Sequence, residues 1–175
     1  MSNANRFRTL VEPWDLHFNS AHFITFGEFC ENLHGHNFHA RVEVSGSNGI
    51  DGYVIDFTLL NRLAADVCRT LHDRVILPGT SPVVRIATEG DMLRIESFDK
   101  VFVLPQKNCI ILPVTNVTAE LLAWHISEEL VKRLAAATSL ATIDEIEVAV
   151  EEADRQWGIF RREIGQSSAA GVLGG

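Results

Sequence analysis

Three things are scarce in this 175-residue chain: cysteine, basic side chains and long apolar runs. Its three cysteines include no Cys-x-x-Cys pair, which argues against a disulfide scaffold or a four-cysteine zinc site and favours the reducing cytoplasm. Fifteen basic residues against 23 acidic ones give a net charge of −8, which argues against nucleic acid or an anionic membrane as a partner. No apolar run approaches the ~20 residues that span a bilayer, and residues 1–8 lack the apolar core of a secretory signal.

The overall composition, with 46% hydrophobic and 22% charged residues, is typical of a globular protein. The length suggests a single domain, which we place at residues 1–165. Residues 166–175 (QSSAAGVLGG) are low in complexity and poor in large apolar side chains, so we expect a flexible tail there.

Hydrophobic periodicity predicts an α+β fold. Strict alternation over residues 34–44 is typical of a half-buried strand, and another strand is expected near residues 143–151. Apolar side chains recur at helical spacing over residues 58–71 and again over residues 118–137. Two helices can cover only one face of a largely antiparallel sheet, and the sheet edges stay open, so we expect an oligomer.

Histidines gather around the first alternating segment. His34 and His36 are two residues apart on the predicted strand, so their side chains point to the same face. His22 ends the preceding predicted strand and can supply a third imidazole. Three imidazoles with an open fourth position are typical of a catalytic zinc site, whereas a single His-x-His pair is also common on ordinary protein surfaces.

Cys30 lies four residues before His34. A thiol beside a divalent cation has a lowered pKa, and the thiolate is the reactive form. Cys30 is therefore a candidate fourth ligand or general base, with a small buried apolar side chain as the alternative. For Cys68 and Cys109 we adopt that alternative.

Residues 30–38 (CENLHGHNF), with Ser-Ala-His at 20–22 upstream, resemble the 6-pyruvoyltetrahydropterin synthase family. That family includes bacterial 6-carboxytetrahydropterin synthase, an early enzyme of queuosine and deazapurine biosynthesis. Further segments are similar to family motifs: residues 52–57 (GYVIDF), 116–120 (NVTAE, with Val117 in place of proline) and 148–152 (VAVEE). The resemblance runs from about residue 15 to residue 160.

The resemblance implies a tunnelling fold (T-fold), in which a four-stranded antiparallel sheet carries two helices on one face and the subunits assemble into trimers and then hexamers. It also implies a zinc ion held by His22, His34 and His36. In this family pattern, Cys30 is the residue that abstracts a proton from the substrate.

The resemblance further implies a carboxylate that anchors the pterin ring. We favour Glu152 over Glu151, because Glu152 keeps the family's spacing to the aromatic side chain at Phe160. A carboxylate can accept two hydrogen bonds from the pterin 2-amino and N3–H groups. Thr118 and Glu120 match positions that line the pterin pocket, and their alternatives are a helix cap and an acidic residue of the first helical turn.

Two features depart from the family pattern. The Asp-His pair that follows the family's first helix is exchanged here to His72-Asp73. Either a shifted loop brings His72 to the site or the proton relay is lost. Residues 78–113 are longer than the usual connection and are predicted to form an inserted pair of β-hairpins. This insertion could cover the pocket, extend an oligomer contact or have no role.

The function implied is that of a zinc-dependent lyase acting on 7,8-dihydroneopterin triphosphate, most similar to 6-carboxytetrahydropterin synthase. The alternatives are a 6-pyruvoyltetrahydropterin synthase or a divergent pterin enzyme, and a non-catalytic pterin- or purine-binding oligomer. In a chain of net charge −8 the phosphates need local cations. Arg74, Arg161 and Arg162 are candidates, with solvated surface charge as the alternative.

Overall fold

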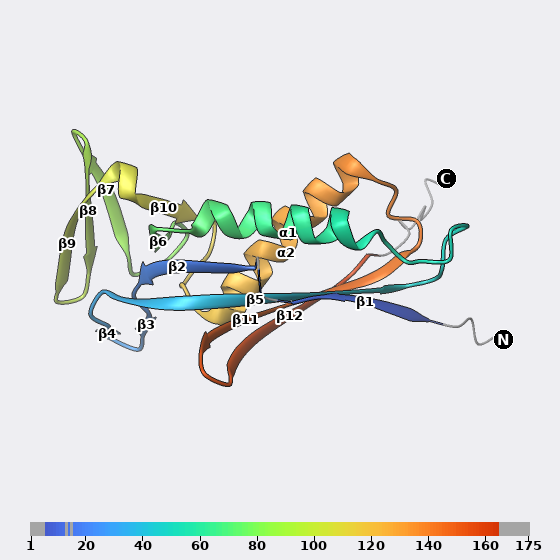
Figure 1. Cartoon of the computed structure of the whole chain (residues 1–175). Helices are drawn as coiled ribbons and strands as arrows, with labels where there is room; N and C mark the ends of the chain where they lie inside the picture. Colours follow the sequence, from blue (N-terminus) through green and yellow to red (C-terminus); the bar gives the residue numbers. More distant parts are fainter. Residues whose placement is uncertain (1–5, 13, 15, 165–175) are drawn as a thin grey trace, which may run out of the picture.

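Strand β5 (His34–Gly46) is the centre of the fold, in a computed structural model that describes residues 6–12, 14 and 16–164 (Figure 1). Along one edge, β5 pairs antiparallel with β2 (His17–His22) through its first half and with β1 (Phe7–Val11) through its second half. Along the other edge it pairs antiparallel with β11 (Ile143–Ala153). The alternation that predicts a strand over residues 34–44 is therefore confirmed.

The sheet is larger than the four antiparallel strands that we expected, and it is mixed. It has seven strands in the order β10-β6-β2-β5-β11-β12, with β1 paired to β5 beside this path. Strand β12 (Gln156–Glu163) continues the antiparallel half, whereas β6 (Arg74–Pro78) runs parallel to β2, and β10 (Cys109–Leu112) runs parallel to β6. Parallel pairing is possible here because long connections separate the paired strands in the chain: residues 23–73 lie between β2 and β6, and residues 79–108 lie between β6 and β10.

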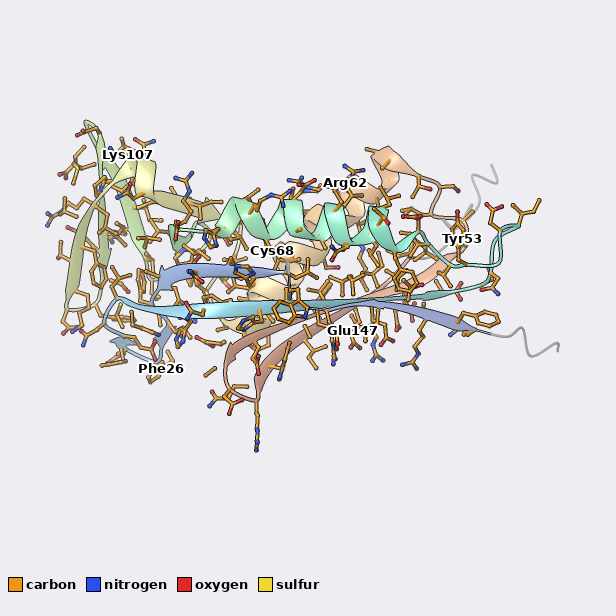
Figure 2. The ribbon with its side chains drawn as sticks, in the orientation of Figure 1. Phe26, Tyr53, Arg62, Cys68, Lys107 and Glu147 are labelled. Atoms are coloured by element: carbon orange, nitrogen blue, oxygen red, sulfur yellow. The ribbon has the colours of Figure 1, made fainter. Side chains whose placement is uncertain are left out.

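Two helices cover one face of the sheet (Figure 1). Helix α1 (Phe57–Leu71) begins where Asp56 accepts a hydrogen bond from the Leu59 amide, and α2 (Ala119–Ala137) begins where Thr118 accepts one from Leu121. Both side chains satisfy amides that the first helical turn leaves without an intrahelical partner. Against these helices β5 buries alternate side chains, among them Phe38, Ala40, Val42 and Val44. Figure 2 shows Cys68 between α1 and the sheet.

The opposite face of the sheet carries charged side chains, and we call it the open face. Arg41 lies over the ring of Trp157 and pairs with Glu147, which Figure 2 shows on the side of the sheet away from the helices. His39 pairs with Glu151 on the same face. The described part of the chain contains no helix that is both long and apolar enough to cross a membrane.

The insertion forms a small sheet of its own at one end of the molecule (Figure 1). Strands β7 (Arg85–Glu89), β8 (Met92–Ser97) and β9 (Lys100–Pro105) make an antiparallel three-stranded meander. A short 3-10 turn, η1 (Gln106–Asn108), then leads into β10 of the main sheet. The expected pair of β-hairpins is present as one meander, in which β8 belongs to both hairpins, and β10 then joins the main sheet.

A second core lies beneath this meander. Leu93 and Ile95 of β8 pack with Phe23, Leu77 and Val84, all nearly inaccessible to solvent. The small hairpin of β3 (Thr25–Phe26) and β4 (Phe29–Cys30) contributes Cys30 to the same cluster. The insertion is therefore packed onto the body of the molecule beside the histidine segment. The flexible tail expected at residues 166–175 lies outside the described residues.

Candidate active site

Four side chains converge on the helix-covered face near one end of β5. His22 ends β2, His34 and His36 begin β5, and Glu152 lies near the end of β11. The ligand atoms of all four lie within 4.8 Å of one another. The register pairs His22 directly with His34, which places them on the same face. The structure thus brings together the three histidines that spacing singled out, and it adds Glu152 to them.

Backbone carbonyls fix the orientation of two of the rings. Nδ1 of His22 lies 2.8 Å from the carbonyl oxygen of Val117, and Nδ1 of His34 lies 2.9 Å from that of Asn32. A carbonyl oxygen only accepts hydrogen bonds, so in each ring Nδ1–H must be the donor. In the neutral ring Nε2 then carries the lone pair that a metal ion needs, and such outer contacts are typical of metal-binding histidines.

The contact between His22 and Glu152 indicates room for a cation. Nε2 of His22 lies 3.0 Å from Oε1 of Glu152, yet this fully buried nitrogen has no hydrogen-bond partner. The same carboxylate oxygen lies 3.5 Å from Nε2 of His36. A lone pair facing a carboxylate in a buried position is unfavourable unless a proton or a metal ion lies between them.

The electrostatics agree with this arrangement. The His22 imidazole holds the pKa of Glu152 below its ordinary value, although partial burial opposes that shift. Burial lowers the pKa of His36, with the Glu152 charge acting in the opposite direction. The first shift favours an ionised Glu152 carboxylate and the second a neutral His36 imidazole, and these are the forms that bind a metal ion. Three imidazoles with one carboxylate fit Zn²⁺ by the chemistry of the donors.

The segment 116–120 supports the histidine cluster from the start of α2. Asn116 exchanges hydrogen bonds with the backbone of Thr25, which ties α2 to the loop that follows His22. The Val117 carbonyl orients the His22 ring, and the Thr118 hydroxyl caps the helix. Glu120 is exposed in the first helical turn. Thr118 therefore has the capping contact that we gave as its alternative role, and its part in binding a pterin stays a prediction.

Cys30 lies apart from the group that its spacing suggested. Its side chain is fully buried in the second core, where its Sγ lies 3.5 Å from the neighbouring Glu31 carbonyl and also forms a hydrogen bond with the Ser97 side chain. Burial raises the pKa of the Cys30 thiol. Burial disfavours the charged thiolate, and the expectation that Cys30 abstracts the proton stays a prediction.

The next residue, Glu31, was not singled out from the sequence. Its Oε2 lies 4.0 Å from Nδ1 of His34, and this buried oxygen has no hydrogen-bond partner. The backbone places it there, because the Glu31 amide donates to the Ile24 carbonyl in the turn that precedes β5. The signal available in the sequence was an acidic residue three positions before His34 within the segment 30–38.

His72 and Asp73 are not brought to the histidine cluster of the same chain. The His72 ring contacts the ring of His17, with 5.9 Å between centroids. His17 differs from His22 by an odd number of strand positions, so the two point to opposite faces of the sheet. Asp73 adopts a left-handed backbone conformation with φ of 54°, and its side chain is mostly exposed. The role of His72 and Asp73 in proton transfer stays a prediction.

Comparison with known proteins agrees with this geometry. A family model described as 6-pyruvoyl tetrahydropterin synthase matches residues 14–163. A protein of Methanocaldococcus jannaschii is 28% identical over 150 residues, covering 85% of this chain and 91% of its own length. A protein of Pyrococcus abyssi is 33% identical over 146 residues, covering 82% of this chain and 85% of its own. Both are named "Putative 6-carboxy-5,6,7,8-tetrahydropterin synthase".

Comparison with solved structures indicates the same family from the fold. The 6-pyruvoyltetrahydropterin synthase of Plasmodium vivax superposes with a TM-score of 0.87 at 32% identity, covering 91% of this chain and 99% of its own. The few unmatched residues cannot include most of residues 78–113, so that structure shares much of the insertion. A second structure of the P. vivax enzyme replaces a glutamate, described as a catalytic residue, with alanine. On this evidence the chain belongs to the 6-pyruvoyltetrahydropterin synthase family.

Proposed function

We propose that this protein is a zinc-dependent lyase acting on 7,8-dihydroneopterin triphosphate, with an activity like that of 6-carboxytetrahydropterin synthase. The observation that carries the proposal is the convergence of His22, His34, His36 and Glu152, with an unpartnered buried nitrogen at its centre. The names of the M. jannaschii and P. abyssi relatives support the same substrate class.

The three histidines would hold the zinc ion, and the bound ion would supply a Lewis acid for the hydroxyl oxygens of the substrate side chain. Glu152 would anchor the pterin ring by accepting hydrogen bonds from its 2-amino and N3–H groups. The lowered pKa of Glu152, caused by the His22 imidazole, keeps this carboxylate ionised for that role.

For the proton-abstracting group we propose Glu31 in place of Cys30. The Glu31 carboxylate has a buried oxygen with no other partner and lies beside His34, whereas the Cys30 thiol is enclosed in the second core. A carboxylate is a general base at neutral pH, and it takes a proton only when it lies within hydrogen-bond reach. The glutamate described as catalytic in the P. vivax enzyme supports this choice of residue type.

Exchange of single side chains tests the choice. We expect Glu31→Gln to lower kcat by about 100-fold or more, with the zinc content unchanged, since general bases contribute about 10²–10⁴-fold. Cys30→Ala is the matched control, and it should leave kcat within a few-fold of the wild type at temperatures well below its melting point. An active Glu31→Gln variant, or an inactive but folded Cys30→Ala variant, would contradict the assignment.

A second candidate within the family is a 6-pyruvoyltetrahydropterin synthase or a related pterin enzyme with another product. This chain shares its fold and much of its insertion with the P. vivax enzyme, and that likeness favours the second candidate. The experiment that decides is incubation of the zinc-loaded protein with 7,8-dihydroneopterin triphosphate, followed by identification of the product by mass spectrometry. A 6-carboxytetrahydropterin product supports our first proposal, a 6-pyruvoyl or other side chain supports the second, and no turnover contradicts both.

We also propose that the protein is a homo-oligomer, a trimer or a hexamer. The strands β12, β1 and β10 each pair with one neighbour only within the described chain, so each leaves an edge available. Exposed apolar side chains, such as Leu10 on β1 and Ile159 on β12, lie on these edge strands. Light scattering after gel filtration gives the mass directly, and a monomer at micromolar concentration would contradict the proposal.

A further inference from the structure

The side chain of Asn116 joins two segments that lie 91 positions apart in the chain. Its Nδ2 donates to the Thr25 carbonyl at 2.8 Å, and its Oδ1 accepts from the Thr25 amide at 3.2 Å. The same Oδ1 accepts from the Val117 amide at 3.1 Å. We call these three hydrogen bonds the Asn116 clamp. Because an amide side chain can make about four hydrogen bonds, most of the capacity of this half-buried residue serves to restrain backbone.

One end of the Asn116 clamp restrains the group that orients His22. The Val117 carbonyl oxygen accepts the Nδ1–H of the His22 ring at 2.8 Å, and both residues are fully buried. Asn116 holds the Val117 amide on one side of this carbonyl. On the other side, the Thr118 hydroxyl accepts from the Leu121 amide at the start of α2. The carbonyl that directs Nε2 of His22 toward the candidate metal site is therefore fixed from both directions.

Valine at position 117 makes this restraint necessary. The segment 116–120 has Val117 where the family pattern has proline. A proline ring fixes φ and has no amide that needs an acceptor. Valine leaves φ free and adds a buried N–H group, which is destabilising without a partner. The neighbouring Asn116 supplies that partner and limits the rotation of the Val117 backbone.

The other end of the Asn116 clamp holds the hairpin that leads to Glu31. Thr25 begins β3 and pairs with Cys30 at the end of β4. The residue before it, Ile24, accepts a hydrogen bond of 3.0 Å from the Glu31 amide through its carbonyl. A fixed Thr25 therefore also fixes the backbone that places Oε2 of Glu31 4.0 Å from Nδ1 of His34.

We propose that Asn116 is a positioning residue, which holds the candidate metal ligand His22 and the proposed base Glu31 in a fixed relation to each other. It acts only through the two backbone segments that it joins. A ligand ring that is already oriented binds a metal ion more tightly, and a base that is already in place abstracts a proton faster. This inference rests on the proposed function, since it takes His22 as a zinc ligand and Glu31 as the base.

Zinc binding tests the role toward His22 without any turnover. We expect Asn116→Ala to weaken zinc binding about 10-fold in competition with a chromogenic chelator, since outer contacts of metal ligands contribute about 10- to 100-fold to metal affinity. The visible absorption spectrum of the Co²⁺-substituted protein should change too, because it reports the ligand geometry. Asn116→Asp keeps the oxygen that accepts from both amides and loses only the donor to Thr25, so its zinc affinity should lie between those of Asn116→Ala and the wild type.

Steady-state kinetics at saturating zinc test the role toward Glu31. We expect Asn116→Ala to lower kcat about 10-fold or more, since a displacement of about 1 Å at a catalytic group can cost about 100-fold. KM for the pterin triphosphate should stay within about two-fold of the wild type, because Glu152 lies on β11 and the Asn116 clamp does not hold it. A kcat that stays within two-fold of the wild type would overturn the role toward Glu31.

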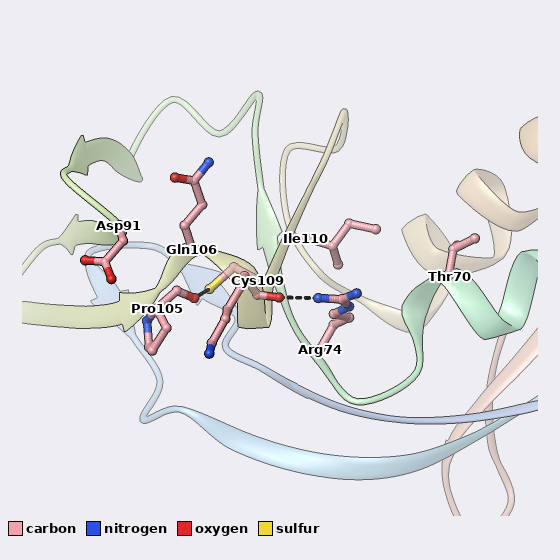
Figure 3. A pocket seen from close by; sticks show the side chains of 8 residues that line it. Thr70, Arg74, Asp91, Pro105, Gln106, Cys109 and Ile110 are labelled. Atoms are coloured by element: carbon pink, nitrogen blue, oxygen red, sulfur yellow. Dashed lines mark hydrogen bonds between the residues drawn. The ribbon is translucent and has the colours of Figure 1, made fainter.

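Two controls remove comparable groups elsewhere. Gln106→Ala deletes an exposed amide side chain from the wall of a cavity beside the insertion, where Figure 3 shows no hydrogen bond from it to the other residues drawn. Thr142→Val removes a hydrogen bond of 3.0 Å to the Val54 carbonyl, so it should lower the melting temperature as a purely structural loss does. Both controls should bind zinc within about two-fold of the wild type.

The outcomes separate this inference from the proposed function. Zinc affinity within two-fold of the wild type in the folded Asn116 variants would overturn the role toward His22. If Asn116→Ala does not fold, Asn116→Asp alone decides. A loss in Thr142→Val as large as that in Asn116→Ala would also overturn it, since stability alone would then explain the effect. Zinc binding that depends on Asn116 in a protein that does not turn over the pterin triphosphate would contradict the proposed function and retain the role toward His22.

Discussion

At the scale of single residues, a backbone carbonyl determines what His22 can do. Because the Val117 carbonyl accepts the Nδ1–H, the neutral His22 ring presents a lone pair at Nε2, directly toward Glu152. That carboxylate cannot satisfy the nitrogen, since both groups are acceptors. The pair is balanced only when a positive charge lies between the two atoms. Glu152 could itself be a fourth metal ligand, and we propose instead that it anchors the pterin ring.

Glu152→Gln separates these two roles. If the three histidines suffice for the metal, the variant keeps its zinc stoichiometry, whereas KM for the pterin triphosphate rises about 10- to 100-fold as a charged acceptor is lost. Zinc content by atomic absorption and steady-state kinetics measure the two effects. His34→Ala serves as the reference for metal loss. A Glu152→Gln variant that loses zinc as fully as His34→Ala would instead make Glu152 a ligand.

The same few residues show how far the sequence alone can reach. The positions of His22, His34 and His36 on one face follow from strand periodicity, because side chains two apart on a strand share a face whatever the rest of the fold does. The burial of Cys30 does not follow from its neighbours, because the side chains that enclose it, Leu93 and Ile95, belong to the insertion. Glu31 stands out as a candidate base only after the structure shows that the neighbouring Cys30 is buried.

At the scale of elements, the strand pieces of the insertion were predictable and their partners were not. The β-hairpins expected within residues 78–113 correspond to β7, β8 and β9, and β10 follows them. Alternation tells which side chains share a face, but it does not tell which strand pairs with which. The parallel pairing of β6 with β2 and β10 therefore could not be derived.

Truncation of the buried side of β8 tests how firmly the meander is part of the molecule. We expect Ile95→Ala to lower the free energy of unfolding by about 2–5 kcal/mol, measured by urea denaturation, since it leaves a cavity in the second core. Val103→Ala on the exposed side of β9 is the control and should change it by less than about 0.5 kcal/mol. Alkylation of Cys30 should become faster in Ile95→Ala only. Unchanged stability in that variant would mean that the meander is packed loosely.

The contact between β12 and the start of α2 depends on the absence of a side chain at Gly158. A Cβ at this position would lie 2.3 Å from the backbone of Ala119 and Glu120, so one of the two elements would have to move. We expect Gly158→Ala to destabilise the fold by about 1–3 kcal/mol or more in urea denaturation. Gly49→Ala is the control, because its Cβ would meet only ordinary contacts at 3.5 Å and beyond. Equal stability of the two variants would contradict this packing.

At the scale of the whole molecule, the two faces of the main sheet differ in kind. The helix-covered face holds the core and, at one end, the histidine cluster. The open face carries exposed ion pairs such as Arg161 with Glu147 and His39 with Glu151. Exposed pairs of this kind contribute little to stability, about 0–1 kcal/mol each. The fold therefore does not need them for its own stability, which leaves the open face and its edges available for the assembly that we propose.

The pH dependence of global stability provides a last test, through His125 on α2. Burial lowers the pKa of His125, against the opposing charge of Glu129. A lowered pKa means that the unfolded chain takes up a proton at a pH where the folded chain does not. This residue therefore costs nothing well above pH 6.5, and it destabilises the fold as the pH falls below that value, by at most about 1.4 kcal/mol per pH unit.

We expect His125→Gln to reduce this loss, so that its free energy of unfolding falls less than that of the wild type between pH 7.5 and 5.5. Urea denaturation of both proteins at the same zinc concentration measures the difference, and the histidines of the candidate metal site contribute equally to both. Glu129 does not disturb the comparison, because its hydrogen bond from Lys132 lowers the pKa of that carboxyl, away from this pH range. Parallel pH profiles for the two proteins would show that His125 takes up its proton equally well in the folded and the unfolded chain.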